Sequence, residues 1–428
     1  MITKQEMQKA AEFIRKNVKA NDFSFSVTGS EDLLTRFAQN GITQHITGNK
    51  LNVSLGVDFD NKNGQASGNN LDEDSLKYLI KTAESMAKLN QPDPENMPSE
   101  GAHKLPDVNN YSQNTADLSV EKIVDDIKIC VENAKKKNAK LSGISEKCLD
   151  HTMLTTKNGF EGFDNSATFS HSMTMKKEGV ETKVSRSVKD HAKLNLPALI
   201  DQLNTQFDSL SNPVQIEKGR IPVILRPAAV LNWLRYLIWT FDRRTADEGH
   251  TPFTDQIGKK FFGDKFTFRS SLDDPDLNAA KFLNGGVPAE NIDWIVNGVL
   301  KNMSATKYYA KQKNLKALRP YNVIVEGGDT SETEMMKMVK RGVIINNFWY
   351  IRPTDRKTGE WTGLTRDGVL YFEDGKIQKS VTNFRWNEIL HDATKRILAM
   401  GPSVQQEYYA KVPTLLINDF NFVDVTTF

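Results

Sequence analysis

The chain has 428 residues, of which 38% are hydrophobic and 26% are charged, and its formal net charge is +2. Because one hydrophobic core rarely serves so long a chain, we expect two or three domains. The near balance of Lys+Arg, 56, against Asp+Glu, 54, excludes an overall basic field, so we expect no direct nucleic-acid binding.

The first residues predict neither export nor membrane insertion. The segment MITKQEMQKAAEFIRKN mixes charged and apolar side chains and lacks the apolar core of a signal peptide. No stretch approaches the roughly 20 apolar residues that span a membrane. The only cysteines, Cys130 and Cys148, are too few for a disulfide framework and fit a reducing compartment. We therefore expect a cytoplasmic protein with no membrane partner.

Residues 1–90 are predicted to form an N-terminal α+β unit. Apolar residues recur at helical spacing over about 3–18 and again over 73–89. Between these helices, alternating residues predict strands near 23–27, within 33–46 and near 51–57, with a short return strand after the turn at 61–64. Asn40-Gly41 breaks the second of these regions. The order is therefore helix, four strands, helix.

Residues 91–118 are predicted to be a linker, because four prolines lie there among polar residues and no apolar period is visible. Residues 119–215 then repeat the first pattern. The predicted helices are 120–136 and 196–210, and the predicted strands lie near 140–149, 151–157, 164–176 and 180–188. Two successive units of this kind indicate either a duplication or one sheet extended across both, and the sequence leaves these alternatives open.

Residues 216–428 are predicted to form a strand-rich C-terminal domain. Asn297-Gly298 and Asp374-Gly375 each separate two short apolar runs, which is typical of a tight hairpin. A helix is expected over 386–400 and a last strand at 415–417. The whole chain is therefore predicted to have an α+β fold.

Residues 221–253 combine a strand, a buried helix and a cluster of charges. A short apolar run at 221–225 precedes Pro227, which suits the first turn of a helix. Val230, Leu234 and Ile238 recur on one face of that helix, and tryptophans widen the apolar stripe. The polar cluster at 242–250 follows directly. It indicates either a cleft at the helix end or charges that cap a core helix.

This stretch resembles the C-terminal domain of the TldD/PmbA family of candidate DNA gyrase modulators. Residues 222–227, Pro-Val-Ile-Leu-Arg-Pro, match the P-V-[VI]-L-x-P strand of that family. Further segments that are similar to the family are 35–44, 253–258, 286–288, 295–300 and 362–377. They keep the order and spacing of the family from about residue 30 to 420, so the resemblance covers nearly the whole chain.

In this family, the TldD-type members are zinc metallopeptidases that carry an HExxxH motif on the helix after that strand. Counting onward, the two zinc-binding histidines correspond to Arg235 and Thr240, and the catalytic glutamate corresponds to Tyr236. A cation at a ligand position repels a dication. The third ligand of the family resembles a downstream cysteine, and no cysteine follows Cys148. The resemblance therefore implies a degenerate metal site with no zinc cofactor and no catalytic residue.

Two other residue groups offer metal ligands elsewhere. Glu388 and His391 are three apart on the predicted 386–400 helix and would share a face. Asp247, Glu248 and His250 lie within four residues. The sequence shows no second group of ligands that would complete either site. An exposed helix face explains Glu388 and His391 better, and a solvated turn explains residues 247–250 better.

A cleft that has lost its metal can still bind an extended peptide through backbone groups. Arg243, Arg244 and His250 follow the former metal helix and could meet a peptide carboxylate. Asn322 and Arg366 lie in segments that resemble the family. A structural role in bracing a hairpin explains Arg366 equally well and explains Asn322 better.

The sequence leaves three functions open. The first is a peptide-binding or partner subunit in proteolysis without zinc, because the family resemblance implies that a metal-free PmbA-type subunit pairs with an active TldD-type subunit. The second is an active peptidase with a non-standard site, and the third is a non-enzymatic interaction protein. If no TldD-type partner exists, a homodimer is expected, because two-fold assemblies are the commonest.

Overall fold

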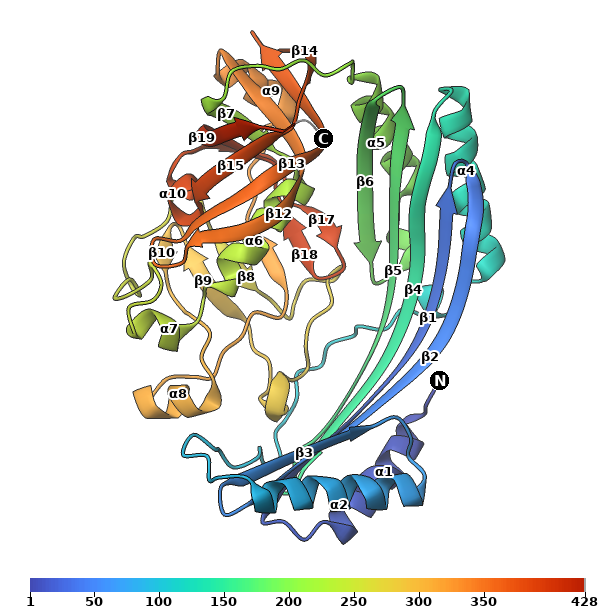
Figure 1. The fold of residues 1–428 in the computed structure, drawn as a ribbon, viewed down its shortest axis with the longest axis vertical. Coiled ribbons are helices and arrows are strands. Elements are labelled where there is room, and N and C mark those ends of the chain that lie inside the picture. The colour runs from blue at the N-terminus through green and yellow to red at the C-terminus, as the bar shows by residue number, and fades with distance from the viewer. Residues whose placement is uncertain (427–428) are drawn as a thin grey trace.

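The N-terminal half is built on one six-stranded antiparallel sheet in the order β3-β2-β1-β4-β5-β6 (Figure 1). The computed structural model describes residues 1–426. The strands are β1 Asp22–Ala38, β2 Gly41–Phe59, β3 Lys62–Gly68, β4 Lys140–Thr156, β5 Glu161–Lys177 and β6 Val180–Val188. Because β1 pairs with β4 from Ser24 opposite Thr156 to Phe37 opposite Gly143, the two predicted N-terminal units share one sheet.

Helices cover one face of this sheet and leave the other face polar. They are α1 Lys4–Asn17, α2 Glu73–Leu89, α4 Val120–Lys136 and α5 Leu196–Asp208. Alternate side chains of β1 point to the helix-covered face. Phe23 and Phe25 pack there with α1 and α2, and Phe37 packs with α4 and α5. The residues between them on β1, such as Ser24 and Ser26, face the other side.

The prediction of four strands in each N-terminal unit is wrong, because the structure has three in each. The breaks expected in β1 after residue 27, in β2 after residue 46 and in β4 near residue 150 do not exist. Polar residues at these points made the strands look interrupted. In the structure they continue the alternation on the polar face and stay paired with a neighbouring strand.

The segment between the two units is anchored to both halves of the molecule, although its composition predicts weak order. It contains the short helix α3 Gln113–Ala116. Ser99 donates from its backbone and its hydroxyl to Asp22 at 2.7 and 2.6 Å. The Asn110 amide donates to the Ala279 carbonyl at 2.5 Å and accepts from the Ala279 backbone at 2.9 Å. Individual polar anchors therefore replace the apolar burial that the segment lacks.

The C-terminal half contains a closed barrel, because β12 pairs with both β7 and β13 in the ring β12-β7-β19-β15-β13. Its strands and their extensions are β7 Gly219–Leu225, β12 Arg341–Asp355, β13 Glu360–Glu373, β14 Lys376–Val381, β15 Phe384–Ile389, β16 Ile397–Met400 and β19 Leu415–Val425. A closed barrel leaves no unpaired edge in its ring.

A second six-stranded sheet, β10-β9-β8-β11-β18-β17, completes the domain. Its strands are β8 Phe268–Ser270, β9 Ile292–Val296, β10 Val299–Leu300, β11 Val323–Val325, β17 Val404–Glu407 and β18 Ala410–Val412. The helices of this half are α6 Pro227–Trp239, α7 Arg243–Asp247, α8 Lys307–Lys313, α9 Glu332–Met338 and α10 Leu390–Lys395, and the chain also has the short turns η1 His191–Lys193 and η2 Asn284–Gly286. Among residues 1–426, no helix has the length and apolar character needed to cross a membrane.

Helix α6 lies at the centre of the C-terminal core. Trp233, Leu234 and Leu237 are buried in one cluster with side chains of the barrel, such as Trp386, and of the second sheet, such as Trp294. The prediction that this helix is buried on most sides is confirmed, but Trp239, which was expected to widen the apolar stripe, is 62% exposed at the helix end. The α+β fold class is also confirmed.

The helix predicted over 386–400 is wrong. The structure has the end of β15, the short helix α10 and β16 there instead. Apolar residues recur at helical spacing in this segment, which explains the prediction. However, β15 pairs with β13 and β19, and these tertiary pairings override the local pattern.

Buried His171 is expected to make the N-terminal half sensitive to acid. It lies beneath α4, where its Nδ1 is 2.8 Å from the Ser145 hydroxyl, and burial lowers its pKa to about 4. The unfolded chain takes up a proton near the ordinary histidine value and the folded chain does not. The free energy of unfolding should therefore fall as pH decreases from about 6.5 to 4, by on the order of 1–3 kcal/mol from this residue.

Urea unfolding at several pH values measures this effect. His171→Gln should show a smaller loss of stability than the native chain between pH 6.5 and 4.5. His250→Gln, at an exposed position, should keep the native pH dependence. Equal slopes for all three proteins would contradict the assignment.

Candidate functional site

The sequence Leu225-Arg226-Pro227 explains why α6 begins where it does. Arg226 has an extended backbone and is the N-cap, and Pro227 follows in the first turn. The Arg226 guanidinium donates to Glu332 at 2.8 and 2.7 Å and to the Asn346 side-chain carbonyl at 2.6 Å. The start of α6 is thereby fixed to α9 and to the barrel strand β12.

The three positions that correspond to the family motif lie at the C-terminal part of α6. Arg235 is exposed, and its guanidinium bonds to the Tyr409 hydroxyl. The ring of Tyr236 packs against Trp361, with 5.0 Å between ring centroids. Thr240 is the C-cap residue, and its hydroxyl donates to the Leu237 carbonyl at 2.6 Å. Each side chain therefore takes part in local packing or capping.

The donor set at these positions does not suit a zinc ion. Zinc in proteins takes cysteine sulfur, histidine nitrogen or carboxylate oxygen, and this part of α6 offers a guanidinium, a phenol and a hydroxyl. Among residues 1–426, no group of three or more His, Cys, Asp and Glu side chains lies close enough together to hold a metal ion.

The two alternative ligand groups are committed to other contacts. Glu388 is the second-to-last residue of β15, is buried, and accepts from Arg396 at 2.6 Å and from the Asn421 backbone at 3.1 Å. His391 lies on α10 stacked on Phe261, and burial lowers its pKa to about 4. Because Glu388 is on a strand, it does not share a helix face with His391, contrary to the prediction.

The charges after α6 form ion pairs with one another. Asp247 accepts from Arg243 at 2.9 Å and from the Tyr309 hydroxyl at 2.7 Å. Burial raises the pKa of Asp247, but these donors outweigh it and leave the pKa lowered. Arg244 donates to Glu248 at 3.0 Å and to Glu95 of the linker at 2.8 Å. The 247–250 run is thus part of a capped, ion-paired turn rather than a ligand set.

The structure places the five residues predicted to contact a peptide on or next to three different elements, α7, β11 and β13. His250 is exposed at the end of α7, close in sequence to Arg243 and Arg244. Asn322 is buried, and its amide exchanges hydrogen bonds with Ser271, which fits a structural role. Within residues 1–426, no hydrogen bond, ion pair or ring contact joins Arg366 to the other four.

A cavity of about 680 Å³ lies beside the C-terminal part of α6. Its wall comes from α6, from the start of α8 and from the loops 283–287 and 317–320. Arg235, Lys307 and Arg319 bring three cations to this wall, whereas Asp242 brings a carboxylate. Lys307 pairs with Glu100 at 2.7 Å, and Arg319 is exposed without an ion pair in the part of the chain described. The wall of this cavity thus carries cations and a carboxylate beside apolar side chains.

Sequence reasoning missed a group of exposed aromatic residues on the barrel. Trp349 and Tyr350 project from β12, and the Arg366 guanidinium lies 4.4 Å from the Trp349 ring centroid. Tyr350 has a φ of 52°, at a point where the register between β12 and β13 shifts. In the sequence, these aromatics continue the apolar run of a buried strand. Only the register shift, which requires the structure, indicates that they turn outward.

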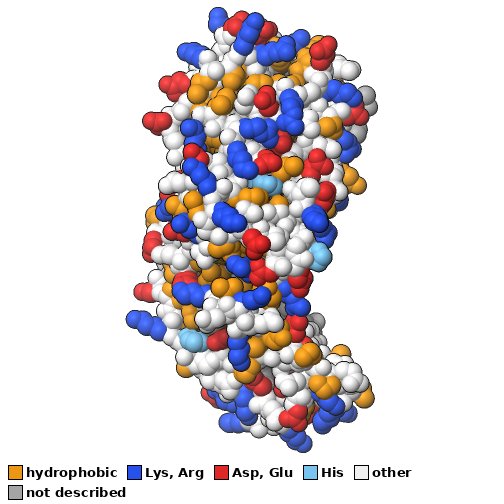
Figure 2. All heavy atoms as spheres, turned by 90° about the vertical axis from the view of Figure 1, so that its left-hand side faces the viewer, with side chains coloured by type: hydrophobic (Ala, Val, Ile, Leu, Met, Phe, Trp, Pro, Cys, Tyr) orange, Lys and Arg blue, Asp and Glu red, His pale blue; other side chains and the backbone are white. Residues whose placement is uncertain are grey.

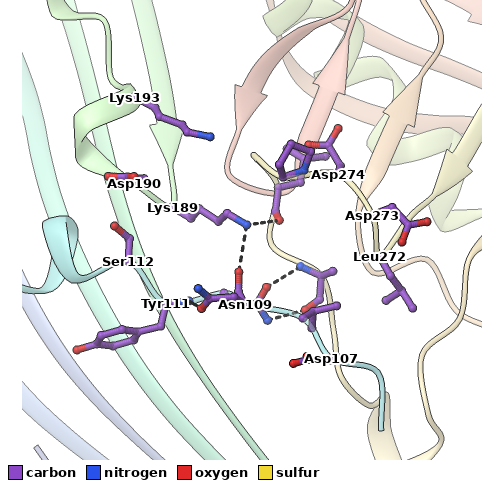
Figure 3. A pocket seen from close by; sticks show the side chains of 15 residues that line it. Asp107, Asn109, Tyr111, Ser112, Lys189, Asp190, Lys193, Leu272, Asp273 and Asp274 are labelled. Carbon is purple, nitrogen blue, oxygen red and sulfur yellow. Dashed lines mark hydrogen bonds between the residues drawn. The ribbon is translucent and has the colours of Figure 1, made fainter.

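A second cavity, of about 460 Å³, lies between the linker, the end of β6 and the loop 272–279 (Figure 3). Lys189 lies across it and donates to the backbone carbonyls of Asn109 at 3.1 Å and Leu277 at 3.2 Å. This lysine therefore ties the linker to the C-terminal half.

The surface charge is mixed rather than of one sign. Figure 2 shows one face of the molecule, on which Lys and Arg side chains are interspersed with Asp, Glu and apolar side chains. This agrees with the balanced composition of the chain.

The fold and the strand–Pro–helix arrangement around α6 are those of a metallopeptidase-related C-terminal domain. Residues 218–424 match the family description "PmbA/TldA metallopeptidase C-terminal domain". The C-terminal domain of this chain therefore belongs to that domain family. No curated protein matches the chain.

Solved structures share the fold over nearly the full length. TldE from Thermococcus kodakarensis is 17% identical, with a TM-score of 0.86, and the alignment covers 98% of this chain and 99% of that one. A candidate modulator of a DNA gyrase from Thermotoga maritima is 18% identical, with a TM-score of 0.85 and coverage of 98% and 99%. One from Bacteroides thetaiotaomicron is 17% identical, with a TM-score of 0.85 and coverage of 99% and 100%.

Proposed function

We propose that this chain is a TldD/PmbA-family protein without a zinc site that acts as a peptide-binding or partner subunit in peptide processing. The observation that carries the proposal is the side-chain set on α6, where Arg235, Tyr236 and Thr240 occupy the positions of the family's HExxxH motif. Each of the three is engaged with protein groups. None is a side chain that zinc prefers.

The partner role is supported by the fold. The chain has the fold of a protein named TldE along its full length, and in this family a metal-free subunit pairs with a TldD-type one. The peptide-binding role is supported by the cavity beside α6, whose wall carries three cations against the one carboxylate of Asp242. A peptide with a free carboxylate is the ligand that this charge favours. Two free cysteines support a cytoplasmic location, which is also part of the proposal.

Metal analysis and hydrolysis together test the proposal. We expect the protein, purified from zinc-supplemented cells, to contain far less than one zinc ion per chain. We also expect no hydrolysis of unfolded polypeptide and no change in melting temperature with a chelator, because no folded metal site would be emptied. The triple variant Arg235→His/Tyr236→Glu/Thr240→His is the matched control. It returns two imidazoles and a carboxylate to α6 and should retain more zinc than the native chain.

One zinc ion per native chain, or peptide hydrolysis that a chelator abolishes, would overturn the proposal in favour of an active metallopeptidase. Co-expression with an HExxxH-bearing relative separates the remaining two functions. A stable complex supports the partner-subunit role. The absence of both such a complex and peptide binding would favour a non-enzymatic interaction protein.

A further inference from the structure

The segment from β9 to β11 is strongly cationic in a chain that is almost neutral overall. Residues 294–325 contain no Asp or Glu, although 54 of the 428 residues of the chain are acidic. The same segment contains six cations, namely Lys301, Lys307, Lys311, Lys313, Lys316 and Arg319. The charge of this segment is therefore larger than the net charge of the whole chain, which is +2.

Two of these cations are neutralised by carboxylates. Lys307 pairs with Glu100 at 2.7 Å, and Lys316 pairs with Glu290 at 2.7 Å. The other four are exposed and make no ion pair within residues 1–426: Lys301, Lys311, Lys313 and Arg319. Unpaired cations close to one another repel, and an anionic ligand would remove that repulsion.

Arg319 brings this segment to the cavity beside α6. It lines the cavity together with Arg235 of α6 and with Lys307, the first residue of α8. The carboxylate in the wall, Asp242, is the N-cap of α7 and accepts there from the Thr245 backbone at 2.8 Å. In the described chain, the guanidinium groups of Arg235 and Arg319 therefore line the cavity without a carboxylate partner.

Helix α8 extends the cationic surface beyond the cavity. Lys311 comes four residues after Lys307, so both lie on the same face of this helix, one turn apart. In Figure 1, α8 lies at the lower left, below the barrel. The cations therefore continue from the cavity wall along α8.

The cavity also has apolar side chains, which bear on the kind of anion that fits. Ile238, Leu283 and Leu318 line it, and among its described lining residues Trp239 is the only aromatic one. Single-stranded nucleic acid binds where successive bases stack on aromatic rings. An aliphatic wall suits the aliphatic side chains of a peptide instead, so the charge and the wall together favour an acidic peptide.

We propose that the cavity and α8 together bind an extended polypeptide segment rich in Asp and Glu. The inference rests on the proposed peptide-binding function and adds the substrate class. In an extended chain, side chains two residues apart point to the same side at a spacing of about 7 Å. Cations one helical turn apart, such as Lys307 and Lys311, have a similar spacing of about 6 Å. A segment with carboxylates at alternate positions therefore matches this face.

Isothermal titration calorimetry of the full chain with three eight-residue peptides tests the substrate class. In the first, glutamate alternates with alanine and leucine, and both termini are blocked. The second has glutamine for every glutamate, and the third is the glutamine peptide with a free C-terminal carboxylate. We expect the acidic peptide to bind at least roughly tenfold more tightly than the other two, because several exposed ion pairs act together. Raised salt should weaken its binding.

Variants without the unpaired cations test the location. Lys311→Gln/Arg319→Gln should weaken binding of the acidic peptide about fivefold and leave binding of the glutamine peptide unchanged. Lys128→Gln/Lys135→Gln is the matched control, because it removes two cations from exposed positions of α4 in the N-terminal half. It should leave the affinity unchanged. The melting temperatures of both variants show whether each has folded.

Equal affinity for the acidic and glutamine peptides would overturn the inference and leave the proposed peptide-binding function standing. Binding of none of the three peptides would overturn both. Equal binding of the acidic peptide and the free-carboxylate peptide would assign the cations to a peptide C-terminus instead. Tighter binding of an eight-nucleotide oligothymidylate would assign them to nucleic acid. An affinity that the folded Lys311→Gln/Arg319→Gln chain retains in full would contradict the site.

Discussion

Replacing Gly298 with alanine is expected to lower the free energy of unfolding by about 3–4 kcal/mol. Gly298 is the second residue of the two-residue turn between β9 and β10 and has a φ of 79°. An added Cβ would lie 2.6 Å from the Phe262 carbonyl oxygen and 2.7 Å from the Gly263 carbonyl oxygen. These are backbone atoms of a segment that is itself bonded to the turn, since the Phe261 and Phe262 N–H groups donate to Gly298. Neither the β9–β10 turn nor the segment at residues 261–263 can move away without breaking those hydrogen bonds.

Gly179 provides the matched control, because it occupies the same position in the turn between β5 and β6. Its φ is 86°, and an added Cβ would meet nothing within 4 Å. Gly179→Ala should therefore cost only the left-handed backbone strain, about 1–2 kcal/mol. Urea unfolding of both variants measures the difference. Equal losses would show that the close approach to residues 262–263 carries no energy.

Replacing Arg226 with methionine is expected to lower the free energy of unfolding by about 3–5 kcal/mol. The Arg226 side chain is only 12% exposed. Its removal leaves the Glu332 carboxylate without its bidentate partner and the Asn346 carbonyl without a donor. Burial raises the pKa of Glu332, but the guanidinium outweighs it and leaves that pKa lowered. The carboxylate is therefore charged and costly to leave unpaired.

The double variant Arg226→Met/Glu332→Met separates the cost of an unpaired charge from the loss of packing. We expect it to be more stable than Arg226→Met alone, because the unpaired carboxylate is gone. Arg244→Met is the exposed control, because Arg244 makes single bonds to two surface carboxylates, Glu95 and Glu248, and it should cost less than about 1 kcal/mol. A double variant that is no better than the single one would contradict the account.

The sequence predicted local features well where a backbone conformation strongly favours a few residue types. The Asn297-Gly298 and Asp374-Gly375 hairpins form as expected, because left-handed turn positions favour Asn, Asp and Gly. The buried helix after Pro227 also forms as expected.

Long-range pairing was not predictable in the same way. Nothing local in β12 indicates that it closes a ring with β13 and β7. The strand at 384–389 has the apolar spacing of a helix, and only its two partner strands decide the outcome. At the candidate site, the resemblance identified the positions on α6. The contact partners of these side chains could not be predicted without the fold. Arg235 bonds to Tyr409 in the 408–409 turn, and Tyr236 packs on Trp361 of β13.

The shared N-terminal sheet has a consequence for how the chain is made. β1 ends at residue 38, and its partner β4 begins at residue 140, so the ribosome must add about 100 residues before the central pairing can start. During that interval the β1–β2 hairpin has two open sides instead of one. Early translation is therefore the period in which this polypeptide is most exposed to mispairing, and a chaperone that binds extended apolar segments would act there.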